Sequence, residues 1–299
     1  MKKIFITASA LLAVMAMNAS VFNTGKMTKV EGAVAEKPVI SADGSFVVSQ
    51  NNVKGGIEKI NLADGSSSVV AQGKGLYHLA LSPDGSTVAF TRPTFNDQHL
   101  KLTSIEAVDM NTGKLQTIVK AGRQVSSGLT LTNNGVTAVN KGRQATKAVS
   151  GKAQAAPVVA IDHGHLTLTV NGKTTVLDPQ GRGSYLWPSL SPDGTKIVYW
   201  LVYRGCFVCD LDGSNARPMG GIRAAVWAGN DALVGVESTD DTAQIPETSV
   251  LVAVDINSGE RQALTDKSIL AQFPSVNADA TRMAFSDMEG NLYYMDLSK

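Results

Sequence analysis

The stretch from Pro188 to Tyr199, Pro-Ser-Leu-Ser-Pro-Asp-Gly-Thr-Lys-Ile-Val-Tyr, places a tight turn directly before a strand. In the turn, Pro presets φ at the second position, Asp tolerates unusual backbone angles and Gly supplies a positive φ. The β-branched and aromatic residues that follow are typical of a strand. The stretch therefore predicts a hairpin of an antiparallel sheet.

Copies of this turn recur along the whole chain. One further copy is complete and four are weaker: Ser82-Pro83-Asp84-Gly85, then Ser41-Ala42-Asp43-Gly44, Thr132-Asn133-Asn134-Gly135, Ala228-Gly229-Asn230-Asp231 and Asn277-Ala278-Asp279-Ala280. A second motif, an apolar strand that ends in Asp or Asn before a Gly turn, follows the copies. The copy at Thr132 departs from this pattern, because Leu166, Leu168 and Val170 run into Asn171-Gly172.

These repeats have the size of propeller blades. Turn, strand, loop, strand, turn and strand make one four-stranded sheet for every ~45 residues. Six such units account for nearly all of residues 27–299. The sequence therefore predicts an all-β, six-bladed β-propeller with four-stranded antiparallel blades, formed by residues 27–299 as a single domain.

The two ends of the repeat region are incomplete in complementary ways. The last repeat stops at Lys299, directly after its third strand, and the segment from Thr28 to Val34 precedes the first repeat without a partner of its own. Closing the ring would remove an exposed strand edge. We therefore expect the N-terminal strand to close the last blade.

The repeat resembles that of a known family. Pro188 to Tyr199, and a weaker copy from Pro274 to Asp279, are similar to the Pro-x-x-Ser-Pro-Asp-Gly repeat of TolB-like propellers over residues ~27–299. The resemblance implies the fold, and relatives of this type include envelope-protein binders, propeller domains of peptidases and some polysaccharide lyases. The chain lacks the additional N-terminal domain of TolB and any Gly-x-Ser-x-Gly nucleophile elbow. The resemblance therefore implies neither the TolB role nor peptidase catalysis.

Residues 1–20 have the layout of a secretory signal peptide. Lys2 and Lys3 precede an uncharged apolar stretch from Ile4 to Met17, and small residues follow. The apolar stretch is shorter than the ~20 residues that a membrane-spanning helix needs. We expect cleavage near Ala19, no membrane span after cleavage, and a periplasmic or secreted protein.

The charge balance argues against nucleic acid as a partner. The chain has 27 Lys and Arg against 26 Asp and Glu, and loss of Lys2 and Lys3 leaves 25 against 26, a net charge of −1. Nucleic-acid binders carry a basic electrostatic footprint. No nucleic-acid partner is predicted.

Aromatic residues cluster where the chain is expected to enter the inner strands, near one mouth of the central channel. They are Tyr77, His78, Tyr185, Trp187 and Phe273. Such side chains could stack on a sugar or grip a peptide, since Trp and Tyr are enriched at binding hot spots. The alternative is that they wedge between neighbouring blades.

Three long connections are expected on the same face as that mouth: residues 92–100, 141–157 and 238–248. Long loops on a rigid scaffold often carry binding sites. The second holds the basic residues Lys141, Arg143 and Lys147, and the third holds Asp240 and Asp241. These five residues are ligand-binding candidates; the alternative is that they lie on solvated loops.

The cysteines and histidines favour no metal or redox site. Cys206 and Cys209 align with apolar positions of the other repeats and, three apart on a strand, point to opposite faces. His163 and His165 lack the third and fourth ligands that zinc needs. No cofactor is predicted, although backbone carbonyls could hold a divalent ion on the channel axis without leaving a trace in the sequence.

Together these patterns predict an exported, non-catalytic binding or scaffold module that holds an envelope protein or an oligosaccharide on its long-loop face. The alternative is a polysaccharide lyase or related carbohydrate-active enzyme with its site in the channel. That enzyme would need acids, histidines and aromatics to converge near the axis, and no catalytic residue is predicted.

Overall fold

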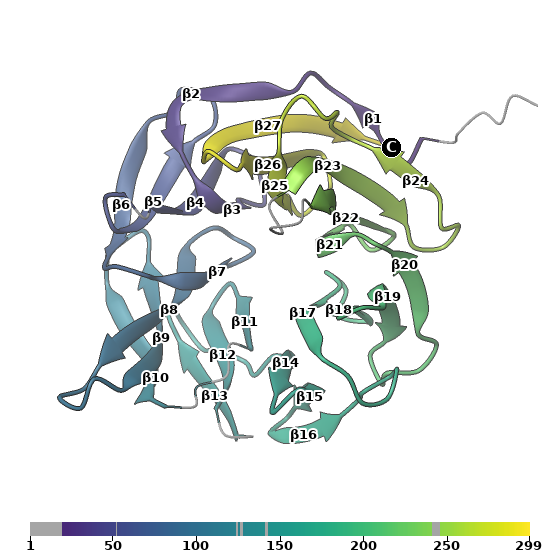
Figure 1. Ribbon diagram of the computed structural model, residues 1–299. Coiled ribbons are helices and arrows are strands. Elements are labelled where there is room, and N and C mark those ends of the chain that lie inside the picture. Colours follow the sequence, from purple (N-terminus) through teal and green to yellow (C-terminus); the bar gives the residue numbers. More distant parts are fainter. Residues whose placement is uncertain (1–19, 52, 124, 126–127, 141–142, 241–245) are drawn as a thin grey trace, which may run out of the picture.

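The described part of the chain is built from strands that form seven sheets in a ring (Figure 1). A computed structural model describes residues 20–51, 53–123, 125, 128–140, 143–240 and 246–299. The expected signal peptide lies outside the described residues, apart from Ser20. The described residues contain no helix long and apolar enough to cross a membrane.

The blades follow one another along the chain. Blade one contains β3 (Glu36–Ile40), β4 (Phe46–Asn51), β5 (Gly56–Asn61) and β6 (Ser67–Gln72). Blade two contains β7 (Tyr77–Leu81), β8 (Thr87–Phe95), β9 (Lys101–Asp109) and β10 (Leu115–Gly122). Blade three contains β11 (Leu129–Thr132), β12 (Gly135–Asn140) and β13 (Arg143–Ala148), and blade four contains β14 (Val158–Asp162), β15 (His165–Val170) and β16 (Lys173–Val176).

The second half of the ring returns to longer blades. Blade five contains β17 (Tyr185–Leu190), β18 (Lys196–Leu201), β19 (Gly205–Asp210) and β20 (Arg217–Gly220). Blade six contains β21 (Arg223–Ala228), β22 (Ala232–Asp240), β23 (Pro246–Asp255) and β24 (Arg261–Ala263). Blade seven contains β25 (Ala271–Val276), β26 (Arg282–Asp287) and β27 (Asn291–Ser298), joined by β1 (Asn23–Thr24) and β2 (Thr28–Val34).

The prediction of six four-stranded blades is wrong, because residues 129–176 form two short blades instead of one. Blades three and four have three strands each, so together they have about the length of one full blade. The first hairpin of blade four turns at His163 and Gly164, which both adopt positive φ, at 50° and 84°. This turn lacks the Ser-Pro-Asp-Gly pattern, so a count of that pattern in the sequence does not include it.

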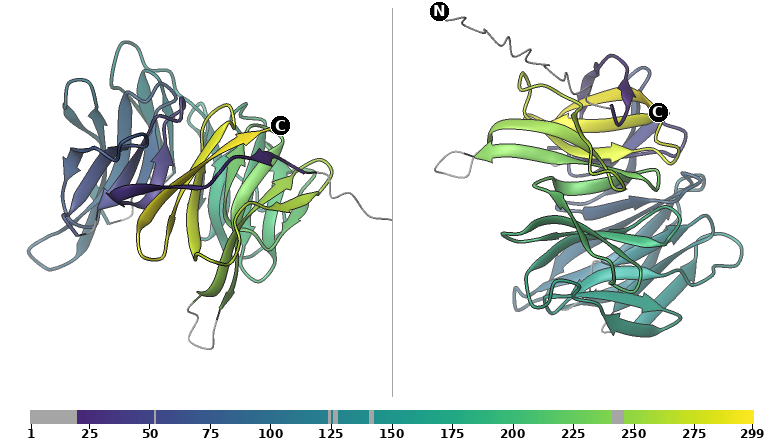
Figure 2. Two further views of the ribbon diagram at one scale, coloured as in Figure 1. Left: turned by 90° about the horizontal axis from the view of Figure 1, so that it is seen from above. Right: turned by 90° about the vertical axis from the view of Figure 1, so that its right-hand side faces the viewer.

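The expected closure by the N-terminal strand is confirmed. β2 pairs antiparallel with β27, with Thr28 opposite Tyr294 and Val34 opposite Asn291. β1 extends the same edge, with Asn23 opposite Ser298. Both views in Figure 2 show β2 running beside β27, so the first and last parts of the chain complete one blade.

The Ser-Pro-Asp-Gly turn is stabilised by its own polar side chains. The Ser191 hydroxyl donates to Asp193 Oδ1 at 2.6 Å, and the backbone N–H of Thr195 donates to the same oxygen at 3.0 Å. These hydrogen bonds lower the pKa of Asp193. Gly194 adopts a φ of 71°, which glycine reaches without steric cost.

Apolar side chains between neighbouring blades form the core. Val48 and Ile57 of blade one pack with Val88 and Phe90 of blade two in one buried cluster. Each blade is therefore stabilised by the blades on either side of it, as expected for a propeller.

Candidate functional site

Five of the seven inner strands carry a β-bulge at the same place. The register jumps between the residue pairs 36/39, 77/80, 186/189, 223/226 and 272/275. One residue in each bulge has a φ between 47° and 51°: Lys37, His78, Trp187, Ala224 and Phe273. A positive φ is costly for such residues, and bulges re-aim side chains. Blades three and four differ, because β11 and β14 pair in unbroken register.

Three consecutive bulges bring cations and aromatic rings together at the channel mouth. Lys37 Nζ lies 5.4 Å from the centroid of the Phe273 ring, and the rings of Tyr77 and His78 lie 4.7 Å apart. Lys101, at the start of β9, places its Nζ 5.2 Å from the centroid of the Tyr77 ring. We call Lys37, Tyr77, His78, Lys101 and Phe273 the mouth cluster.

The mouth cluster favours the neutral form of His78. Burial of the ring lowers the pKa of His78, and the positive charges of Lys37 and Lys101 lower it further. An anion placed between these groups would reverse the effect of the two lysines, because opposite charge favours the protonated imidazole. The cluster is therefore suited to an anionic ligand.

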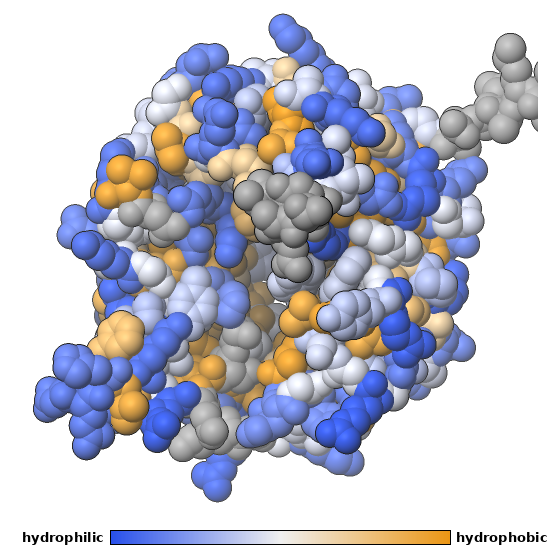
Figure 3. All heavy atoms as spheres, in the orientation of Figure 1, coloured by the Kyte–Doolittle hydropathy of each residue, from blue (hydrophilic) through white to orange (hydrophobic). Residues whose placement is uncertain are grey.

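A cavity of about 620 Å³ adjoins His78. Its wall comes from the inner strands of blades two to five: residues 78–80, 128–130, 159–161 and 185–190. Figure 3 shows the molecule hollowed at the centre of this face. The wall is largely apolar, and among the described residues that line it only His78 and Tyr185 titrate. A wall of this kind suits binding more than acid–base chemistry.

The aromatic candidates divide between the cavity and the core. Trp187 lines the cavity, is 50% exposed and contacts the ring of Trp200 at a centroid distance of 6.3 Å. Tyr185 is 1% exposed, packs against Tyr199, and donates its hydroxyl proton to the carbonyl of Gly181 at 2.7 Å. Tyr185 therefore packs as a core residue that also reaches the cavity wall.

The sequence predictions missed Lys37 and Lys101. A signal for Lys37 was present, because Lys37-Pro38 occupies the bulge position that Trp187-Pro188 and Phe273-Pro274 occupy in their blades. No comparable signal marked Lys101, which reaches Tyr77 from the hairpin between β8 and β9.

Of the five charged loop candidates, the structure describes the side chains of Arg143 and Lys147. Arg143 and Lys147 belong to β13, a strand at the outer rim. Residues 92–95 extend β8, and residues 238–240 and 246–248 belong to β22 and β23. Asp240 ends β22, but its side chain lies outside the described residues, as do Lys141 and Asp241.

The two neighbouring histidines each bind a carboxylate. His165 Nδ1 lies 2.5 Å from Asp178 Oδ2, and His163 Nδ1 lies 2.8 Å from Asp162 Oδ1. Across the described ranges, no group of three or more His, Cys, Asp or Glu side chains could hold a metal ion.

The two cysteines are buried thiols, and we predict that they do not react in the native protein. Each is 1% exposed, and burial raises the pKa of both Cys206 and Cys209 to about 12. Because the thiolate is the reactive form, labelling by a disulfide reagent at neutral pH should be at least about a hundredfold slower in native than in denatured protein. Rapid labelling of the native protein would contradict this burial.

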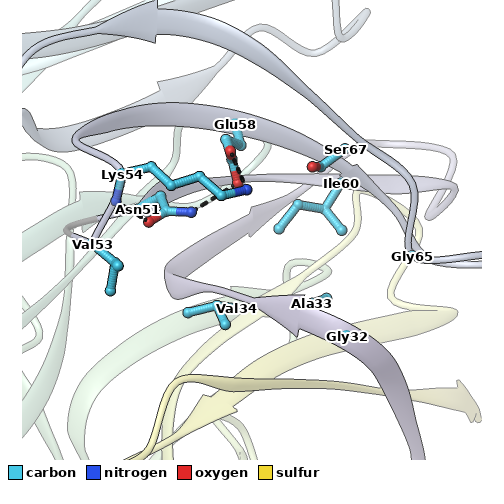
Figure 4. A pocket seen from close by; sticks show the side chains of 10 residues that line it. All are labelled: Gly32, Ala33, Val34, Asn51, Val53, Lys54, Glu58, Ile60, Gly65 and Ser67. Atoms are coloured by element: carbon cyan, nitrogen blue, oxygen red, sulfur yellow. Dashed lines mark hydrogen bonds and ion pairs between the residues drawn. The ribbon is translucent and has the colours of Figure 1, made fainter.

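A second, smaller hollow of about 170 Å³ lies between β2 and blade one (Figure 4). Its polar groups bind one another: Asn51 Nδ2 donates to Glu58 Oε2 at 2.9 Å, and Lys54 Nζ donates to Glu58 Oε1 at 3.1 Å. Glu58 is 6% exposed. Because these partners satisfy its carboxylate, the channel mouth is the stronger candidate for a ligand site.

Comparisons with known proteins support the fold and no finer identity. No family model matches the chain, and no curated protein matches it. An oligogalacturonate lyase solved in complex with manganese is similar at 14% identity and a TM-score of 0.51, over 90% of this chain and 79% of that one. An oligogalacturonate lyase from Vibrio parahaemolyticus has 13% identity and a TM-score of 0.48, over 89% and 79%.

The likeness to the manganese complex supports a β-propeller fold alone. The TolB-like family stays a resemblance. The described residues offer no cluster of side chains suited to manganese, so we derive no step through a metal.

Proposed function

We propose that this protein is a non-catalytic binding propeller whose channel mouth holds an acidic oligosaccharide. The observation that supports the proposal is the mouth cluster, in which bulges of three consecutive blades aim Lys37, His78 and Phe273 at one place. Left-handed backbone at non-glycine residues costs free energy, and such strain tends to occur at functional sites.

The chemistry of the mouth fits a sugar that carries carboxylates. Lys37 and Lys101 offer charge-assisted hydrogen bonds to carboxylate oxygens. Phe273 and the half-exposed Trp187 offer faces on which sugar rings can stack, and Trp187 belongs to the apolar wall of the cavity. The similar solved structure is named as a lyase of oligogalacturonate, which suggests an acidic probe.

The proposal includes export. Residues 1–20 have the layout of a signal peptide, so the ligand would be met in the periplasm or outside the cell. Amino-terminal sequencing of the protein purified from the periplasm or the medium tests this, and an intact Met1 in the mature protein would contradict it.

Titration of the mature protein with oligogalacturonate, followed by tryptophan fluorescence, tests the binding proposal. Trp187 lines the cavity, so a bound sugar should change its emission. An uncharged malto-oligosaccharide of equal length should bind at least about tenfold more weakly, a difference of about 1.4 kcal/mol. Equal binding of both sugars, or binding of neither, would contradict the proposal.

We also predict that the acidic sugar binds more tightly as the pH falls through the range in which His78 titrates. A bound anion raises the pKa of His78, so binding takes up a proton and acid favours the complex. The pH dependence should be lost in His78→Gln, which keeps a polar side chain but cannot acquire charge. A pH dependence unchanged in His78→Gln would show that another group titrates.

The second candidate function is a lyase or related carbohydrate-active enzyme. It is favoured by the position of His78 on the cavity wall. Burial and the two lysines lower the pKa of this imidazole, and its neutral form can accept a proton from a bound sugar. Incubation with oligogalacturonate should then produce unsaturated sugars with strong ultraviolet absorbance, and His78→Gln should abolish them. Binding without product formation favours the non-catalytic proposal.

A further inference from the structure

One part of the chain has an extreme charge pattern. From Met110 to Ile161 there is no Asp or Glu, whereas seven Lys and Arg occur: Lys114, Lys120, Arg123, Lys141, Arg143, Lys147 and Lys152. The segment covers the outer strand β10 of blade two and all of blade three. Lys147 Nζ donates to the carbonyl of Thr117 on β10 at 2.5 Å, so the two rims are neighbours.

Blade three also presents an unpaired strand edge at this place. β13 pairs with β12 and, within the described chain, with no other strand. The backbone N–H of Val149 donates to the carbonyl of Asn134, and this pair continues the register in which Lys147 lies opposite Val136. Since hydrogen-bonded pairs alternate along an antiparallel ladder, residues 144, 146 and 148 turn their N–H and C=O groups away from β12.

The chain does not return along this edge as it does in the four-stranded blades. After β13 it crosses the sheet instead: Gln144 Nε2 donates to the carbonyl of Ala156, and the N–H of Ala156 donates to Thr137 Oγ1 on β12. Ala153 lies against Gly135, also on β12. The position that a fourth strand would take is therefore not filled by the segment that follows β13.

We propose that blade three is completed by an extended acidic segment of a protein partner, which adds as a fourth strand to β13. Strand addition to an exposed edge is a recurrent mode of peptide recognition, in which backbone hydrogen bonds give affinity and alternate side chains give specificity. The fourth strands of other blades have between 3 and 8 residues, so the added segment should be of similar length.

The charge of nearby side chains distinguishes the open strand edge of blade three from that of blade four. Arg143 and Lys147 share one face of β13 and are exposed, so acidic residues at alternate positions of an added strand would lie opposite them. Blade four has a comparable edge at β16, but the carboxylates of Asp162 and Asp178 lie in that blade beside its histidines. Of these two open edges, the one on blade three is therefore suited to an acidic strand.

The test uses the mature protein and a seven-residue peptide of alternating Glu and Val, followed by calorimetry and amide hydrogen exchange. We expect binding that weakens with added salt, and slower exchange at the amides of residues 144, 146 and 148. Ala148→Pro removes one outward N–H and should lower the affinity at least about tenfold. The matched control is Val176→Pro, which removes an outward N–H of β16 and should change the affinity less than about twofold.

The outcomes separate the proposal from its alternatives. Equal weakening by Ala148→Pro and Val176→Pro, or binding without slower exchange at these amides, would overturn strand addition. Displacement of the peptide by oligogalacturonate in the Lys37→Glu variant would show a general polyanion surface instead. If Ala148→Pro fails to fold, Arg143→Glu/Lys147→Glu tests the same edge with its backbone intact, and unchanged affinity in that variant would overturn the proposal.

Discussion

Deleting residues 27–35 from the mature protein should lower the free energy of unfolding by about 5 kcal/mol, because the deleted strand closes the ring. β2 pairs with β27, and Val30, Ala33 and Ala35 are buried in a cluster shared by blades one and seven. The deletion exposes the apolar faces of both blades and leaves β27 as an open edge. Urea unfolding followed by circular dichroism measures the loss.

The matched control for the deletion is Lys29→Ala/Glu31→Ala, which changes two exposed residues of β2 and leaves its buried face intact. This variant should unfold within about 0.5 kcal/mol of the unchanged protein. An unchanged midpoint in the deletion variant would mean that β2 contributes nothing to ring closure.

The N-terminal closure could be predicted in part. Counting strands showed that the last repeat lacked a partner and that residues 28–34 had none. The second anchor could not be predicted: the N–H of Phe22 donates to Gln262 Oε1 and Gln262 Nε2 donates to the carbonyl of Phe22, both at 2.8 Å. Phe22 is 1% exposed, but a single apolar residue after a signal-like segment carries no periodicity that would place it in the core.

The fold class could be predicted from the sequence because each Ser-Pro-Asp-Gly turn is stabilised by hydrogen bonds of its own side chains. Side-chain hydrogen bonds of the Ser-Pro-Asp-Gly turn join residues five positions apart at most, so each copy signals its own hairpin. The number of blades was not readable in the same way. The turn at His163-Gly164 relies on positive φ and lacks those side chains. In the sequence, its histidines have the spacing of a metal-ligand pair and give no indication of a turn.

Only part of the candidate site could be predicted from the sequence. Aromatic residues at the starts of inner strands indicated the mouth, and the structure places His78 and Trp187 at its cavity. The bulges that aim them depend on backbone register between strands, and a proline follows the bulge residue in only three of the five bulged strands. Lys101 reaches the cluster from a different hairpin, and only the folded ring brings it to Tyr77.

The largest functional effect is expected from reversing the charge of the mouth. Lys37→Glu/Lys101→Glu should lower the affinity for oligogalacturonate about a hundredfold, or about 2.7 kcal/mol, because each carboxylate would then face an acid instead of a cation. The two lysines also lower the pKa of His78, so their replacement should raise that pKa and move the pH dependence of binding upward. Fluorescence titration across a pH series measures both effects.

The control for this reversal makes the same change in net charge on the same two blades. Lys59 of blade one also lies over an aromatic ring, with its Nζ 4.1 Å from the Phe46 centroid, and Lys114 lies in the turn before β10 of blade two. Lys59→Glu/Lys114→Glu should change the affinity less than about threefold, since charges distant from the mouth are screened by salt. If both double variants weaken binding equally, the sugar is attracted by overall charge, and the mouth cluster is not its site.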